Sequence, residues 1–148
     1  RQMCIRDRYY GERIVLKAQA LGLNSCWVAA TYSKGACRKA CGLEKDEKLA
    51  CAIALGYGET QGVPHESKPL TELFELCSAA GKAPEWFVKG VEAAALAPTA
   101  LNRQNFNIVL LEDGRVRLEK QGACAALDLG IVRYHFEQGA GKENFEWA

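Results

Sequence analysis

The segment FNIVLLEDGRVRLEK, residues 106–120, constrains the fold more than any other part of the sequence. Two β-prone runs flank Glu-Asp-Gly, an arrangement typical of the tight turn between two antiparallel strands. We therefore predict a β-hairpin over residues 106–120. Helices and strands are predicted to alternate earlier in the chain, so the whole pattern indicates an α+β fold in which a mixed sheet is flanked by helices.

The other elements follow from the spacing of apolar residues. Gly22 or Asn24 can close a first helix, and Ser33 can cap a second. Pro69 and Pro84 suit the first turns of two further helices. The predicted elements are helices over residues 9–24, 34–43, 69–80, 85–97 and 126–140, a short buried strand over 25–30, a strand covered on both faces over 49–58, and surface connections over 44–47 and 58–68.

Composition and charge exclude several classes of protein. The chain has 148 residues, of which 49% are apolar and 25% charged, and this profile predicts one globular domain. Its 19 basic and 18 acidic residues are mixed along the chain without a basic stripe, so we expect no nucleic-acid partner. No apolar run has the length of a membrane span, and we expect a cytoplasmic protein with no membrane association.

The seven cysteines, at positions 4, 26, 37, 41, 51, 77 and 124, indicate free thiols rather than a disulfide framework. Their number is odd and no C-x-x-C unit is present, which is typical of a protein in a reducing compartment. Cys26 and Cys51 lie in apolar runs and are expected to be small buried residues. The candidate metal ligands are scattered along the chain, so no metal site is predicted.

A polar loop interrupts the apolar pattern in LAPTALNRQNF, residues 96–106. Pro98 fits the end of the preceding helix, and Thr99, Asn102 and Gln104 precede the next strand. Such side chains stabilise helix-to-strand turns by bonding to nearby backbone groups. They also suit the recognition of a polar ligand, and the residues by themselves leave both interpretations open.

Four segments together resemble the flavin-dependent nitroreductase family. They are LGLNSCWVAA (residues 21–30), ALGYG (54–58), SKPLTEL (67–73) and LAPTALNRQNF (96–106), and the resemblance extends over nearly the whole chain from Tyr9 onward. In most members the Ala-Pro-Ser segment precedes the Cys-Trp strand, whereas here the corresponding segment follows it. This order resembles a rearranged subgroup of nitroreductases in which two related halves sit in one chain.

The resemblance also sets an expectation for the ends of the fold. Family members carry an arginine-rich segment that binds the flavin phosphate, and RQMCIRDR, residues 1–8, does not match it. We expect residues 1–8 to be non-native or disordered. Residues 9–148 are then expected to form a nitroreductase-like domain that is the C-terminal part of a longer protein.

The family resemblance implies FMN as cofactor and NAD(P)H as co-substrate in a homodimeric enzyme. Flavin would carry hydride to a nitroaromatic or quinone-like acceptor, so no side chain is assigned a catalytic role. Lys68, before Pro-Leu, corresponds to a basic family position and is the candidate for the phosphate. The implied cofactor-binding residues are Lys68, Pro98, Thr99, Asn102, Gln104, Ala29 and Ala30. The alternatives are a flavin-binding or flavin-sequestering protein without turnover and a structural remnant that binds no flavin.

Overall fold

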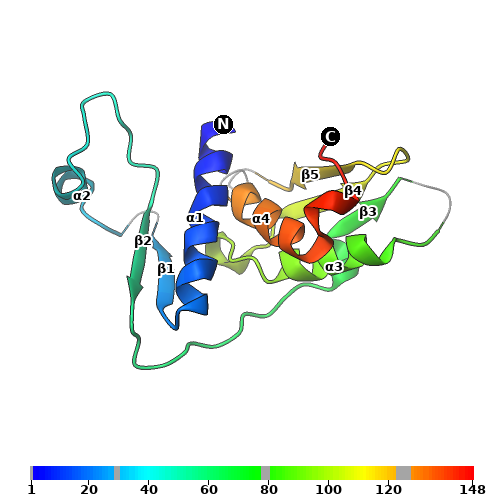
Figure 1. Cartoon of the computed structure of the whole chain (residues 1–148), viewed down its shortest axis with the longest axis horizontal. Helices are drawn as coiled ribbons and strands as arrows, with labels where there is room; N and C mark the ends of the chain where they lie inside the picture. Colours follow the sequence, from blue (N-terminus) through cyan, green and yellow to red (C-terminus); the bar gives the residue numbers. More distant parts are fainter. Residues whose placement is uncertain (1, 29–30, 78–80, 123–127) are drawn as a thin grey trace. The chain divides into compact units, whose positions relative to one another are not determined.

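A computed structural model describes residues 2–28, 31–77, 81–122 and 128–148 of the chain (Figure 1). The length predicts one domain, but the contacts form two compact units, a larger unit of residues 1–12 and 63–148 and a smaller unit of residues 13–62. None of the described helices is both long and apolar enough to cross a lipid bilayer.

The order of elements is that of an α+β protein. The elements are α1 (Gln2–Ala20), β1 (Asn24–Val28), α2 (Lys34–Ala40), β2 (Ala52–Gly56), η1 (Leu70–Glu72), β3 (Phe74–Leu76), α3 (Glu85–Ala95), η2 (Ala100–Asn102), β4 (Phe106–Leu110), β5 (Val116–Lys120), α4 (Leu129–Ala140) and η3 (Lys142–Asn144). Residues 2–8, expected to be non-native or disordered, are helical as the start of α1. Whether they are native to the fold stays a prediction.

The larger unit contains a mixed sheet with strand order β3-β4-β5, whereas the strands predicted over residues 25–30 and 49–58 pair with each other in a separate sheet. The predicted hairpin is confirmed, because β4 and β5 pair antiparallel with Ile108 opposite Leu118. Gly114 makes the turn at a φ of 82°, a left-handed conformation that favours glycine. β3 pairs with β4 in parallel, which makes the sheet mixed.

The helix predicted over residues 69–80 is wrong. Pro69 does begin a helical turn, but this turn is the short η1, and Phe74–Leu76 then form β3. Leu73, between the two, is fully buried, and its carbonyl accepts a hydrogen bond from the N–H of Ile108. Pairing with the edge of β4 has therefore overridden the helix propensity of this segment. Residues 78–80 lie outside the described residues.

α3 and α4 pack closely against each other in the larger unit (Figure 1). Both helices agree with the sequence prediction, although residues 126–127 of the predicted second helix lie outside the described residues. Phe87 of α3 and Phe136 of α4 are fully buried and form an edge-to-face pair with centroids 5.8 Å apart. Gly139 lets the backbones approach, because a Cβ there would lie 2.3 Å from the Lys89 carbonyl oxygen.

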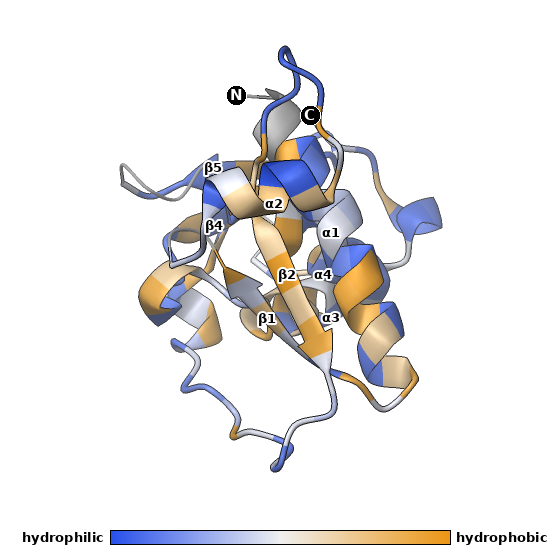
Figure 2. Cartoon of the chain, turned by 90° about the vertical axis from the view of Figure 1, so that its left-hand side faces the viewer, coloured by the Kyte–Doolittle hydropathy of each residue, from blue (hydrophilic) through white to orange (hydrophobic). Residues whose placement is uncertain are grey.

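The smaller unit is built on β1 and β2, which pair antiparallel with Cys26 opposite Ala54. The predicted cap of α2 is confirmed, because the Ser33 hydroxyl accepts a hydrogen bond from the N–H of Ala36. The predicted burial of both strands is wrong. Cys26 is exposed and Leu55 is 48% exposed, since these two strands form a two-stranded sheet within the described part of the chain. Figure 2 shows the apolar character of β2 along its length.

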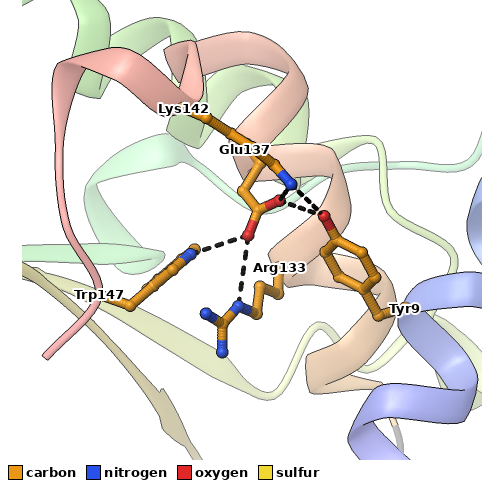
Figure 3. A network of polar contacts seen from close by, with 5 residues as sticks. All are labelled: Tyr9, Arg133, Glu137, Lys142 and Trp147. Atoms are coloured by element: carbon orange, nitrogen blue, oxygen red, sulfur yellow. Dashed lines mark hydrogen bonds and ion pairs between the residues drawn. The ribbon is translucent and has the colours of Figure 1, made fainter.

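The C-terminal tail is fastened to α4 through the buried Glu137 carboxylate, which is 5% exposed (Figure 3). Its Oε1 accepts a hydrogen bond from the Trp147 indole at 2.9 Å. The same oxygen forms an ion pair with Arg133 Nε at 3.4 Å. Its Oε2 accepts from the Tyr9 hydroxyl and from Lys142 Nζ, the latter at 2.7 Å. Burial acts to raise the pKa of Glu137, but the hydrogen bonds from Lys142, Tyr9 and Trp147 outweigh it and lower the pKa.

Replacing Glu137 with glutamine should destabilise the protein in a pH-dependent way. At neutral pH we expect a loss of about 1–3 kcal/mol, because the charge-assisted hydrogen bonds of a buried carboxylate are lost. A depressed folded-state pKa contributes stability that is present above the ordinary value of 4.5 and is lost as the pH falls through the folded-state pKa. The difference between wild type and Glu137→Gln should therefore shrink on acidification below that value.

Urea unfolding at a series of pH values measures this difference. Glu143→Gln, an exposed change on the same tail, is the matched control and should stay within about 0.5 kcal/mol of wild type. A destabilisation that is equal at neutral and acidic pH would contradict the proposed role of the Glu137 charge.

Candidate functional site

The loop between α3 and β4 holds an unusual backbone conformation. Leu101, Asn102 and Gln104 have positive φ values of 55°, 52° and 46°. For residues with a side chain this left-handed region costs about 1–2 kcal/mol each, least for asparagine. Such a conformation persists only where surrounding contacts impose it, and it is frequent at ligand-binding loops.

Hydrogen bonds within the larger unit impose this conformation. The Thr99 hydroxyl accepts from the N–H of Gln104 at 3.0 Å, and the Thr99 carbonyl accepts from the N–H of Asn102. Asp128, before α4, accepts from the N–H of Ala100 at 3.1 Å. Burial raises the pKa of the Asp128 carboxyl, and the Ala100 N–H opposes this effect. The interpretation that Thr99 stabilises the turn is thus confirmed.

The side chain of Gln104 makes hydrogen bonds to three residues of the site. It is 2% exposed, and its amide oxygen accepts from the backbone N–H of Lys68 at 2.9 Å. Its amide nitrogen donates to the Glu66 carbonyl at 2.9 Å and to Asn102 Oδ1 at 3.0 Å. Both N–H groups of this amide are therefore engaged by the protein. A direct contact between Gln104 and a cofactor stays a prediction, and its observed role is to position its neighbours.

Residues 65–67, which the sequence indicates only as a surface connection, are part of this site beside Lys68. His65 Nε2 lies 3.0 Å from the Ala95 carbonyl oxygen, and the Ser67 hydroxyl donates to the same oxygen at 3.1 Å. They satisfy a carbonyl at the C-terminal end of α3 that has no partner within the helix. Sequence reasoning missed His65, Glu66 and Ser67, because a polar stretch without periodicity carries no signal for such long-range contacts.

Two side chains of this cluster keep unused hydrogen-bonding capacity. Lys68 is half-buried, and its ammonium donates to the Gln104 carbonyl at 3.3 Å, which leaves further N–H groups. Asn102 is exposed, donates to the Glu66 carbonyl at 2.9 Å and accepts from Gln104. One N–H group and one lone pair of its amide remain. Beside them, Leu101 is 82% exposed.

The predicted cofactor residues thus divide into three groups. Lys68, Thr99, Asn102 and Gln104 come together in one polar cluster, and the exposed Pro98 leads into it. Ala29 and Ala30 lie outside the described residues, so their assignment stays a prediction. The remaining donors, one ammonium and one amide, fit a ligand that carries an anionic group and neighbouring hydroxyl or carbonyl groups, as FMN does.

A surface pocket of about 590 Å³ is lined in part by Tyr9, Arg133, Glu137 and Lys142. The charges of its Glu137 and Lys142 are paired with each other, as Figure 3 shows, so these groups serve to hold the tail. Within the described ranges, no group of three or more His, Cys, Asp or Glu residues is placed to hold a metal ion.

Comparisons with known proteins agree with the sequence resemblance. A family model described as "Putative TM nitroreductase" matches residues 8–140. The crystal structure of a putative nitroreductase from Thermotoga maritima superposes on this chain with a TM-score of 0.72 and 28% identity, over 97% of this chain. The chain spans 58% of the length of that protein. No curated protein sequence matches the chain.

Proposed function

The chain belongs to the putative TM nitroreductase family, and from this premise we propose that it is part of an FMN-dependent oxidoreductase. The enzyme would take hydride from NAD(P)H and pass it to a nitroaromatic or quinone-like acceptor in the cytoplasm. The observation that carries the proposal is the polar cluster. It brings Lys68 and Asn102 together around Gln104, although 34 positions separate the first two in the sequence (102 minus 68).

Each residue of the cluster has a distinct task in this proposal. Lys68 offers its ammonium to the cofactor phosphate, and Asn102 offers its remaining amide groups to the adjoining polar part of the flavin. Thr99 and Gln104 bind protein groups and hold the loop in its left-handed conformation. When bound, FMN supplies the two-electron hydride chemistry, so these residues bind and orient rather than transfer protons.

We also propose that the complete site is shared between two copies of the chain. Leu96, at the start of the loop segment, and Leu101, in its middle, are 66% and 82% exposed. Large apolar side chains that are exposed beside a polar site suit contact with a second surface. In a homodimer the second subunit would cover them. As the family resemblance implies, residues of both subunits would then line the flavin site.

Two measurements test the proposed function against its alternatives. The purified protein, incubated with FMN and desalted, should keep the absorbance of bound flavin, and it should then consume NADH or NADPH when a nitroaromatic is added. Flavin retention without consumption of either nucleotide would favour a flavin-binding or flavin-sequestering protein. Failure to retain flavin would favour the structural remnant, an alternative motivated by the lack of a match to the family's phosphate-binding arginine segment in residues 1–8.

Lys68→Ala should weaken FMN binding by about 1.5–3 kcal/mol, the contribution of one charge-assisted hydrogen bond. Riboflavin, which lacks the phosphate, should bind wild type and Lys68→Ala equally if the ammonium contacts the phosphate. Fluorescence titration with both flavins measures the two affinities. Arg103→Ala, which removes an exposed cation of the same loop, is the matched control and should bind both flavins as wild type does.

Two results would contradict this assignment. An unchanged FMN titration for Lys68→Ala would remove Lys68 from the site. An equal loss for FMN and riboflavin would place the ammonium at the ring or ribityl chain rather than at the phosphate.

Asn102→Gly should reduce flavin affinity more than it reduces the stability of the flavin-free protein. Glycine adopts the observed φ of 52° without strain. Leucine, which is similar in size to asparagine but cannot hydrogen-bond, would add a backbone penalty that obscures the loss of the amide. We expect a loss of about 0.5–1.5 kcal/mol in binding, the contribution of one neutral hydrogen bond. Titration with FMN and thermal unfolding without flavin give the two quantities.

Gln104→Met is the structural control for this experiment. Its buried amide makes three hydrogen bonds, so the flavin-free protein should lose about 1–3 kcal/mol of stability when the amide is removed. If Asn102→Gly also caused the larger loss in the flavin-free protein and left flavin affinity unchanged, then Asn102 would serve only the turn.

A further inference from the structure

Two thiols of the smaller unit lie one helical turn apart and take no part in the proposed function. Cys37 is half-buried in α2, and Cys41 is the exposed residue at its C-terminal cap. Within the described residues, neither sulfur has a hydrogen bond or disulfide partner. Side chains at positions i and i+4 of a helix lie on the same face, so the two thiols are neighbours.

Hydrogen bonds at the C-terminal end of α2 keep Cys37 and Cys41 one helical turn apart. Cys41 has φ −86° and ψ −4°, which is right-handed backbone, and its N–H donates to the Cys37 carbonyl at 2.9 Å. The Arg38 guanidinium donates to the carbonyls of Glu44 and Glu47 at 2.7 and 2.6 Å. The turn after the helix is therefore fixed by hydrogen bonds, and the pair of thiols is presented on an ordered element.

The distance between the two cysteines determines which bonds their sulfur atoms can form. Neighbouring positions on a helix place the Cβ atoms about 5–6 Å apart, whereas a disulfide requires about 3.5–4.5 Å. A direct disulfide would therefore distort the last turn of α2. A single atom that bonds to both sulfurs spans the wider gap without distortion. Among the described residues no third Cys, His, Asp or Glu is placed with the pair to build the four-ligand coordination typical of structural zinc.

We propose that Cys37 and Cys41 form a dithiol site for one thiophilic centre held by two sulfurs, such as a soft metal ion or trivalent arsenic. Soft centres prefer sulfur ligands, and two sulfurs suffice for them. With an organic arsenic(III) oxide, two As–S bonds form and the bonds from arsenic to oxygen break. The two thiol protons leave with the oxygen as water, and no atom is oxidised or reduced.

The test uses phenylarsine oxide as the probe and intact-protein mass spectrometry as the readout. An excess of the monothiol 2-mercaptoethanol removes arsenic from single cysteines, whereas an adduct chelated by two protein thiols resists it. Wild type should retain one phenylarsenic group per chain under these conditions. Addition of the dithiol 2,3-dimercaptopropanol should remove the group and restore the original mass.

Three variants decide between this pair and the other cysteines. Cys37→Ser and Cys41→Ser should each lose the retained adduct, while a variant with serine in place of the five other cysteines, at positions 4, 26, 51, 77 and 124, should keep it. Unchanged circular dichroism of the two single variants would show that α2 remains folded. Absence of a retained adduct on wild type, retention by either single variant, or its loss from the fivefold variant would overturn the proposal.

Discussion

The buried amide of Gln104 is the contact on which the candidate site depends. It joins the backbone of Lys68 and Glu66 to the side chain of Asn102, and so connects two segments that are distant in the sequence. Because the amide is 2% exposed, each of its polar groups needs a protein partner, and the partners found are those that fix the loop. The left-handed backbone at Leu101 and Asn102 accompanies these contacts and the hydrogen bonds of Thr99.

The two polar clusters of the larger unit, around Glu137 and around Gln104, use their hydrogen-bonding groups in different ways. Around Glu137, each carboxylate oxygen receives donors from the tail, from α4 or from Tyr9, so the carboxylate is engaged in fastening the C-terminus. Around Gln104 the buried groups are also satisfied, but Lys68 and Asn102 keep donors and acceptors that the loop does not use. These free groups lie beside a loop in left-handed conformation, and for this reason we propose ligand binding at the second cluster.

In the smaller unit, strand β2 is more exposed than its sequence predicts. A continuous apolar run such as that of β2 is typical of a strand with both faces covered. In this chain β2 pairs with β1 alone among the described strands, and Leu55 remains half exposed. The exposure of this face therefore departs from the sequence signal of a covered strand.

The sequence by itself determined the local elements and the family. The hairpin around Gly114, the cap at Ser33 and helix α3 after Pro84 follow from short-range turn and capping chemistry, and the structure has each of them. Only the tertiary structure decided that residues 74–76 form a strand, because a pairing with Ile108 outweighed the local helix signal. It likewise decided that Glu66 and Lys68 contact the loop of Asn102 and Gln104. His65 and Ser67 contact the end of α3. Hydrogen bonds between distant segments depend on how the chain folds back on itself, and residue spacing along the sequence does not encode that geometry.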